Sequence, residues 1–541
     1  MDRRARFACI ACRRLKRKCP KELPSCSLCL RLEKRCEYPL RARNASDNTN
    51  GESATCSQSP NGETSLQLSN NGSIDLQLGY EREALLGNGS IRDFPAMFFL
   101  DSEVCFKPLS SELNQAMPSA APCYNLSTEA LIVHDNYFST IHHWLPILSK
   151  KIARRHLGEH ALVPNSPSQL LFLCMKLVSE PIPSEISPRV NRTYAQVLET
   201  LLKVENSCLP CLQLLQSVIL VAIYEIGHAV YPAAYLRVGH ASRLCVMMGF
   251  HDRKSASQLF KDAVGWTGRE EERRAWWAVF CLDRIMNQGV SGIPLTTPEP
   301  SPGELLPCPE ESWNEGGIGF NEPLFAASFS NNTSLGSFAN VCQAAHVLGR
   351  VLHHRDNLHN SNVDLCFRVS EAKQLHHILI ALSSHLSDIS QESMSSGASI
   401  SVATAICFSA RLILYEIYAC NEKYSTDHGR SSDEAEMQQN SMAGILDSAG
   451  SIWQLSRQSL DLLNQDSQDG LSNCSPLLCH CLYTVAAECE WLMREQEDSS
   501  ARIWLRDIVE LLQIIGKRWQ VAGVYLSEVY KWPGYNSLVK S

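Results

Sequence analysis

The chain has 541 residues, and its 44% hydrophobic content is ordinary for a globular protein and allows a large core. No uninterrupted apolar run has the length of a membrane span, and the richest stretch, Leu212 to Ile226, is broken by polar side chains. We therefore expect a soluble protein with no membrane partner. The net charge of −8 is unevenly divided: residues 1–43 hold 14 Lys and Arg against 4 Asp and Glu, formally +10, which leaves −18 on the rest. A basic head on an acidic body fits a DNA-binding module on a body that is not itself a polyanion binder.

The head contains six cysteines in two half-motifs of equal spacing. They are Cys9, Cys12, Cys19, Cys26, Cys29 and Cys36, with gaps of two, six, six, two and six residues. Structural zinc takes a tetrahedron of thiolates or imidazoles, and a two-residue gap places a ligand pair on one ion. Two such ions need eight ligand positions, so six sulfurs suffice only if two of them bridge. The repeat makes Cys9 and Cys26 the natural bridges, and the pattern predicts a binuclear cluster of two Zn²⁺ ions.

Two other uses of these cysteines are possible: disulfide bonds and a zinc module without a DNA function. Six cysteines can form disulfides in fifteen ways, but no apolar stretch of signal-peptide length precedes Cys9, so we expect a reducing compartment. A zinc module without a DNA function would leave the charge of the head unexplained, since roughly +8 remains after six thiolates and two zinc ions are counted. The charge favours zinc-dependent DNA binding.

Residues 7 to 39 resemble the DNA-binding domain of the fungal six-cysteine binuclear zinc cluster transcription factors. All the cysteine spacings agree, as do the basic run after Cys12 and Pro24 in the middle loop. The chain departs from the family at Leu15, where a basic residue is usual, and at Pro20, where an acidic one is common. The resemblance implies two short helices around two zinc ions, double-stranded DNA as the partner and a nuclear location. The helix after the second cysteine would enter the major groove.

The resemblance also implies roles for the basic side chains of the head. Lys16 and Lys18 match family positions that contact guanine O6 and N7, so a CGG-type triplet is the expected half-site. The remaining cations would lie on phosphates and position the module; they are Arg13, Arg14, Arg17 and Lys21.

Residues 44–126 are expected to be a mostly disordered linker. The stretch from 40 to about 92 is rich in Asn, Ser and Gly and cannot bury enough apolar surface to offset chain entropy. Its leucines and isoleucines are spaced by twos, so no coiled coil is predicted, and a homodimer would have to form elsewhere. Ile91 to Pro108 is a short apolar island that either docks on the body or recruits a partner; docking is favoured because exposed aromatics are costly.

Helical periodicity begins near Ser127. A cluster of His134, His142 and His143 with neighbouring aromatics is interpreted as core and surface histidines, although a metal site was considered. Leu212 to Ile226 has the stripe of an amphipathic helix. The Cys208-x2-Cys211 pair before it is interpreted as structural and not redox-active, with Pro210 opening the helix.

Two further segments predict consecutive helices. Ala233 to Phe250 reads as a helix whose end is marked by Gly249. Glu270 to Arg274 is interpreted as a capped helix start with an i,i+4 ion pair, followed by a helix that is apolar nearly all round and therefore buried. Tyr235 to Lys254 and Glu270 to Arg284 together are similar to the fungal-specific transcription factor regulatory domain. That resemblance implies an all-helical domain that controls the activator, sometimes by sensing a small molecule.

The remainder of the chain also predicts helices. Gly289 to Pro309 is dense in Pro and Gly and is expected to be a loop. Helical stripes follow at Leu375 to Ile389 and Trp504 to Ile515, with mobile loops expected at 390–400 and 421–445. Glu488 to Asp498 is interpreted as a solvated helix face, with an activation segment as the alternative. No sustained strand alternation is present, so the predicted fold class is all-α.

The predicted domains are a zinc cluster at 1–43, the linker at 44–126, the regulatory domain at 127–330 and a helical continuation at 331–541. The predicted function is a transcription factor for RNA polymerase II genes that works with the transcription machinery. Family habit suggests a secondary-metabolite gene cluster or a nutrient pathway. An enzyme is not expected, because no nucleotide-binding Gly-rich loop, GxSxG or HExxH motif is found. A ligand-sensing or interaction protein with weak DNA binding is the alternative.

Overall fold

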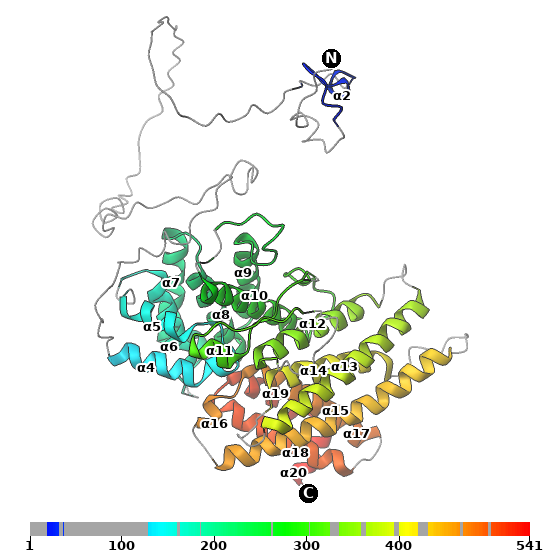
Figure 1. Ribbon diagram of the computed structural model, residues 1–541. Helices are drawn as coiled ribbons and strands as arrows, with labels where there is room; N and C mark the ends of the chain where they lie inside the picture. Colours follow the sequence, from blue (N-terminus) through cyan, green and yellow to red (C-terminus); the bar gives the residue numbers. More distant parts are fainter. Residues whose placement is uncertain are drawn as a thin grey trace, which may run out of the picture. The chain divides into compact units, whose positions relative to one another are not determined.

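The computed structural model describes residues 19–31 and 36 of the head and most of 128–540 (Figure 1). Within the second range it leaves out 160–162, 184–185, 261–262, 264, 302, 325–334, 359–363, 394–399, 420–430, 466–468 and 496–498. The chain divides into two compact units, Met1–Gly87 and Asn88–Ser541, which are described separately below. The predicted linker and the apolar island at Ile91 to Pro108 lie outside the described residues.

The second unit, called the body here, is helical throughout its described part, as the sequence predicts. Its described residues form no β-strand, and an isolated antiparallel bridge joins Leu305 and Pro323. The α-helices are α4 (Thr128–Ser139), α5 (Lys150–Glu159), α6 (Pro167–Ser179), α7 (Arg192–Ser207), α8 (Leu212–Gly227), α9 (Ala233–Met247), α10 (Trp266–Met286), α11 (Glu310–Glu315), α12 (Ser337–Asp356), α13 (Leu365–Ser393), α14 (Val402–Ala419), α15 (Ser432–Gln465), α16 (Asp469–Ser472), α17 (Cys479–Glu495), α18 (Ser499–Gly516), α19 (Gln520–Val529) and α20 (Pro533–Lys540). Short 3₁₀ turns lie at η2 (Ile141–His143), η3 (Pro188–Val190) and η6 (Pro476–Leu478).

The body helices pack around two central helices. In the first half α8 contacts α6, α9 and α10, and in the second half α14 contacts α12, α13, α15 and α17. Figure 1 shows the cyan and green helices of the first half gathered on one side and the yellow to red helices on the other. Contacts of α10 with α12 and of α19 with α8 join the halves, so that one continuous apolar core runs through the body.

The prediction of a helix at Leu212 to Ile226 is confirmed, but the expected amphipathic stripe is wrong. Helix α8 is buried on every side from Leu214 to Gly227, including its polar residues. Gln216 donates from Nε2 to the Ile147 carbonyl at 3.0 Å, and Glu225 accepts from the Tyr194 hydroxyl at 2.7 Å. These hydrogen bonds from remote segments give both polar side chains a partner within the core, although Oε2 of Glu225 has no hydrogen-bond partner there.

Helix α14 has the length of a membrane span, although Arg411 and Glu416 interrupt its apolar sequence. Within the described residues it alone has the length and composition to cross a bilayer, with a mean hydropathy of 1.4, and 83% of it is buried inside the body. A central core helix has the same apolar character as a membrane helix because both are surrounded by hydrocarbon. Burial identifies α14 as a core helix.

Helix α9 ends as the sequence predicts. Gly249 has φ +78°, and the amide of the following Phe250 donates to the Cys245 carbonyl at 3.0 Å. This is the closure that a left-handed glycine gives to a helix C-terminus. The tip of Gln258 occupies the space where a side chain at Gly249 would lie.

Helix α10 begins at Trp266, four residues before the acidic run that was predicted to start it. Glu270 and Arg274 form the expected i,i+4 pair at 3.0 Å, but both side chains are fully buried. Glu270 also accepts from the Cys308 amide at 2.9 Å and from Asn321 at 2.9 Å. The run is therefore a buried connection to the end of the proline-rich loop (Gly289 to Pro309) and to the segment after it, and not a capped helix start. The apolar continuation through Trp276 and Trp277 is buried as predicted.

A second buried network at the end of α10 holds the proline-rich loop. The Asp283 carboxylate accepts from the amides and the hydroxyls of Thr296 and Thr297, with the five contacts between 2.7 and 3.2 Å. Arg284 donates to Asp283 and reaches Glu299 at 3.0 Å. The segment thus serves packing, because the buried carboxylate of Asp283 and the buried guanidinium of Arg284 are paired with each other away from water.

Two segments that were expected to be mobile loops, 390–400 and 421–445, are helical in part. Residues 390–393 are helical, and α15 begins at Ser432, inside the expected loop at 421–445. Ser431 accepts from the Glu434 amide at 3.2 Å and Glu434 accepts from the Ser431 amide at 2.8 Å. This is a capping box, a local signal that the sequence analysis overlooked. The remainder of the two loops, 394–399 and 421–430, lies outside the described residues.

The segment at Glu488 to Asp498 is not a solvated face at its start. Glu488 is buried in α17, and burial raises its pKa to about 8, with the Glu416 carboxylate adding to the shift. The stripes at Leu375 to Ile389 and Trp504 to Ile515 lie in α13 and α18 as predicted, with Leu379 and Ile508 fully buried.

We expect Glu271 to make the stability of the body fall as the pH rises. Its side chain is buried and accepts from the Ser149 amide at 2.7 Å, and burial raises its pKa from 4.5 to about 8. The folded state therefore holds a proton that the unfolded state releases, so this stabilisation is complete below pH 4.5 and is lost as the pH rises to about 8. Glu271→Gln should remain neutral and should gain on the order of 2 kcal/mol over wild type at alkaline pH.

The measurement is urea unfolding of both proteins, followed by circular dichroism across this pH range. The difference between them is the informative quantity, since other buried groups titrate in both. Glu315→Gln, at an exposed position of α11, is the matched control and should show a pH-independent difference. A constant difference for Glu271→Gln would contradict the assignment.

Candidate metal and DNA-binding site

The described part of the head brings three predicted zinc ligands together. The sulfurs of Cys26, Cys29 and Cys36 all lie within 4.8 Å of one another. Cys26 and Cys29 are buried, at 0% and 2% exposure, although this segment has almost no apolar core to bury them. Cys19 packs against them from the preceding segment. The sulfurs themselves form the centre of the module.

Local backbone geometry places these sulfurs. Helix α2 (Ser27–Arg31) starts directly after Cys26 and puts Cys29 in its first turn, so the two-residue gap brings both sulfurs to one side. The Cys29 amide donates to the Cys26 sulfur at 3.4 Å, and the Cys26 amide donates to the Cys36 sulfur at 3.2 Å. The amide of Ser27 donates to Glu22 at 2.7 Å, which holds the preceding loop against the helix.

This donor set fits zinc. Sulfurs that share one tetrahedral zinc are about 3.8 Å apart, given bonds of about 2.3 Å, and the observed grouping accommodates that separation. Amide donors to sulfur stabilise the thiolate form that binds a metal and orient the ligands. Packing alone does not explain three neighbouring sulfurs here, because this short segment has almost no other apolar side chains to pack against them.

Most of the other predicted site residues lie outside the described residues. These are Cys9, Cys12, Arg13, Arg14, Lys16, Arg17 and Lys18. Lys21 is described: its side chain is exposed, and its backbone has φ +66° in the turn that follows Cys19. An exposed cation beside the cysteine group is the arrangement that a phosphate contact requires.

The histidine cluster and the Cys208-x2-Cys211 pair of the body take part in packing and in helix capping. His134 and His142 are buried, and His142 pairs with Asn314 Oδ1 at 2.9 Å. Cys208 and Cys211 are free thiols, and Cys211 occupies the N-cap of α8, so the helix begins two residues after Pro210.

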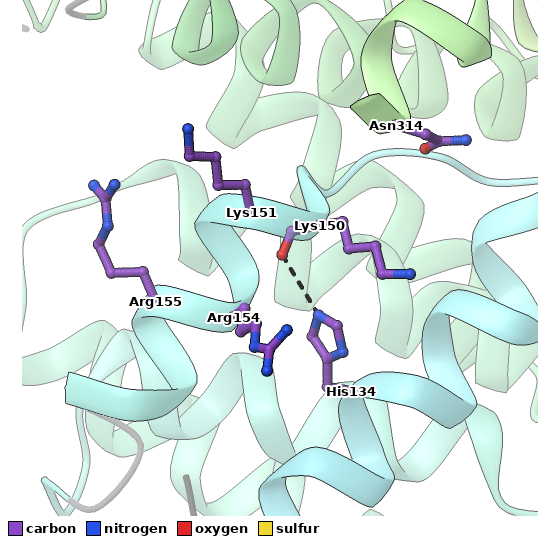
Figure 2. A pocket seen from close by; sticks show the side chains of 6 residues that line it. All are labelled: His134, Lys150, Lys151, Arg154, Arg155 and Asn314. Carbon is purple, nitrogen blue, oxygen red and sulfur yellow. Dashed lines mark hydrogen bonds between the residues drawn. The ribbon is translucent and has the colours of Figure 1, made fainter. Parts of the chain in front are cut away.

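The structure also contains a basic cavity that the sequence analysis did not anticipate. It lies among α4, α5 and α11 and is shown in Figure 2. The signal for it was the run from Lys150 to Arg155, which carries four cations in six residues.

A cysteine-clustered basic head and an all-helical body define a class of protein, the zinc-dependent DNA-binding regulators. Comparison with known families agrees with this. Residues 7–45 match the fungal Zn(2)-Cys(6) binuclear cluster domain, and residues 134–403 match the fungal specific transcription factor domain.

Several curated proteins are similar to parts of the chain. Transcription factor BOA15 of Botryotinia fuckeliana is 36% identical over 184 residues, which are 33% of this chain and 98% of that protein. The pigment biosynthesis transcriptional activator pigB of Monascus ruber is 30% identical over 149 residues, or 26% of this chain and 27% of that protein. The azaphilone cluster-specific transcription factor azaR of Aspergillus niger is 28% identical over 272 residues, or 47% and 56%. The chain thus covers less than two thirds of the length of pigB and of azaR.

The chain belongs to the family of fungal zinc cluster transcription factors. Membership implies zinc binding, DNA binding and a nuclear location, and the family consists of transcription factors and not of enzymes. Among solved structures, the K. lactis CBF3 core matches with a TM-score of 0.39 and 13% identity over 80% of this chain and 91% of that chain, a likeness on which no argument rests.

Proposed function

We propose that this protein is a sequence-specific regulator of RNA polymerase II genes that recognises CGG-type triplets through its zinc-bound head. The grouping of the Cys26, Cys29 and Cys36 sulfurs within 4.8 Å carries the proposal, because it places the ligands of one half-motif where zinc needs them. In the full site Cys9, Cys12 and Cys19 complete the ligand set, and Cys9 and Cys26 bridge two zinc ions. The metal supplies the folding energy of a module too small to form a core.

The domain limits proposed are 1–43 for the head, 44–126 for the linker, 127–330 for the regulatory domain and 331–541 for the helical continuation. The family match at 7–45 supports the first of these, and the match at 134–403 covers most of the third and the beginning of the fourth. We assign the target genes to a secondary-metabolite cluster, which the names of the pigment and azaphilone regulators support. Binding as a homodimer and recruitment of the transcription machinery complete the proposal.

In this proposal Lys16 and Lys18 donate to guanine O6 and N7 in the major groove and carry the base preference. Arg13, Arg14, Arg17 and Lys21 contact phosphates, so they orient the module and make affinity fall steeply with salt concentration. Residues 44–541, with a net charge of about −18, add nothing to general DNA affinity and leave recognition to the head.

The test is a binding-site selection with the full-length protein from a random DNA pool, with zinc and again with a strong chelator. Enrichment of CGG-type triplets that disappears on chelation is the expected result. The spacing of paired triplets then reports a dimer, whereas single triplets would contradict the homodimer. No enrichment by protein that has bound zinc would overturn specific DNA binding and favour a ligand-sensing or interaction protein.

We expect Lys16→Ala and Arg17→Ala to have different effects in this selection. Lys16→Ala should relax the preference at one guanine, at a cost of about 1–3 kcal/mol on the preferred site. Arg17→Ala should weaken all sequences alike and reduce the slope of log affinity against log salt by about 1. If Lys16→Ala kept the preferred triplet at lower affinity, the two roles would be reversed.

A further inference from the structure

The basic cavity of the body has a volume of about 370 Å³, within the range of small-molecule sites. Figure 2 shows its lining side chains, with Asn314 contributed by α11 and the cations by α5. The lining residues are His134, Lys150, Lys151, Arg154, Arg155 and Asn314. Among the described residues no carboxylate lines it, although the net charge of residues 44–541 is negative.

The wall of the cavity is held in place by buried contacts. His134 on α4 is 2% exposed, and its ring lies 2.9 Å from Asp135 Oδ1 and 3.4 Å from the Lys150 carbonyl. The Nε2 atom of His142 forms a hydrogen bond with Oδ1 of Asn314 at 2.9 Å, which holds the Asn314 side chain in position. The ammonium of Lys150 lies 5.9 Å from the centroid of the Phe138 ring. The cavity therefore combines two hydrogen-bonded side chains, His134 and Asn314, with the exposed cations of α5.

The four cations of α5 destabilise this helix when no anion is bound beside them. Lys150 and Arg154 are four residues apart, as are Lys151 and Arg155, and like charges at this spacing destabilise a helix. They also lie in the first two turns, close to the positive end of the helix dipole. Among the described residues none of them forms a salt bridge or a side-chain hydrogen bond. An anion in the cavity would remove both penalties.

The positive potential extends to a neighbouring buried group. Burial, together with the charges of Arg274, His143 and Lys150, lowers the pKa of His142 to about 4, although the hydrogen bond that Asn314 Oδ1 accepts from the ring acts in the opposite direction. A group behind the cavity therefore stays uncharged near neutral pH. This leaves the cations of α5 as the charge that a ligand would meet.

We propose that this cavity binds a compact small anion that carries several phosphate or carboxylate groups. The cations come from one helix and face a hollow of small-molecule size, which suits a compact ligand better than an extended duplex. The negative body around the cavity also repels the phosphates of a long polyanion, whereas a small anion experiences mainly the local positive charge. The site is independent of the DNA-binding head.

The test uses calorimetric titration of the full-length, zinc-loaded protein with inositol hexasulfate, and neutral inositol as the control ligand. Sulfate oxygens compete poorly with thiolates for zinc, so the probe leaves the head loaded. Lys151→Ala/Arg154→Ala removes two exposed charges from the cavity. Arg502→Ala/Lys517→Ala removes two exposed charges from α18 and from the residue after it. Any binding by the basic head is common to all three proteins.

We expect the cavity variant to bind the probe about tenfold more weakly than wild type, since each charged contact at an exposed site contributes a modest amount. The control variant should bind as wild type does, and inositol should not bind. The probe should also raise the melting temperature of wild type more than that of the cavity variant. Glycerate bisphosphate and tricarballylate then identify whether phosphate or carboxylate is preferred.

Equal binding by wild type and the cavity variant would overturn the proposal, as would equal weakening in both double variants. Duplex DNA is the remaining occupant to test. If the cavity variant kept the affinity for inositol hexasulfate but lost affinity for duplex DNA, these cations would belong to a DNA contact, and the small-anion proposal would be wrong. Circular dichroism of each variant checks that the helical body is folded.

Discussion

Cys26→Ser is expected to abolish sequence-specific DNA binding by the full-length protein. Cys26 is fully buried, its sulfur belongs to the three-sulfur group, and it accepts a hydrogen bond from the Cys29 amide at 3.4 Å. A serine hydroxyl is a poor ligand for zinc at neutral pH, and the position is also a proposed bridge between two ions. Loss of the bridge should therefore unfold the head. Fluorescence anisotropy with labelled DNA and zinc analysis by mass spectrometry measure the two effects.

The matched control is Cys366→Ser, which changes an exposed thiol on α13 and should leave DNA affinity and zinc content unchanged. A strong chelator should reproduce the Cys26→Ser result in the wild-type protein. The helical signal of the body should persist in both cases, because an apolar core holds its described helices together. Wild-type affinity and two bound zinc ions in Cys26→Ser would disprove the role given to Cys26.

Asp283→Ala is expected to lower the free energy of unfolding of the body by about 3–5 kcal/mol, the usual range when one partner of a buried ion pair is removed. Asp283 is 2% exposed and accepts hydrogen bonds from the amides and hydroxyls of Thr296 and Thr297. The substitution leaves these donors and the fully buried Arg284 without their carboxylate. Unsatisfied buried donors carry their full desolvation cost.

Urea unfolding followed by tryptophan fluorescence measures this loss. Asp461→Ala is the control, because its exposed pair with Arg457, at 3.9 Å, should contribute less than about 0.5 kcal/mol. Asp283→Asn retains the shape and part of the acceptor capacity, so its loss should be intermediate. A loss for Asp283→Ala no greater than that of the control would show that the network does not hold the proline-rich loop.

The sequence predicted the elements whose signals are local. The two-residue gap between Cys26 and Cys29 anticipated the grouped sulfurs, and the glycine at 249 anticipated the end of α9. The apolar sequence after Arg274 anticipated a buried helix. In each case the information lies within one or two helical turns, where spacing and backbone preference act directly.

The errors concern side chains whose environment depends on remote segments. Glu270 was expected in a capped helix start, but its partners at Cys308 and Asn321 come from 38 and 51 residues later in the chain. Glu488 looked solvated, although α17 packs against α14 and buries it. The start of α15 is a different case, because its capping box at Ser431 and Glu434 was visible in the sequence.

The sequence by itself determined the class of protein, since a metal cluster is encoded by ligand spacing and a charged head by composition. Only the tertiary structure decided which charged residues of the body are buried and which line a cavity. The cations of α5 are visible in the sequence as a run, but the hollow beside them exists only because α4 and α11 pack there. Burial and concavity are properties of contacts between distant segments, and no local pattern specifies them.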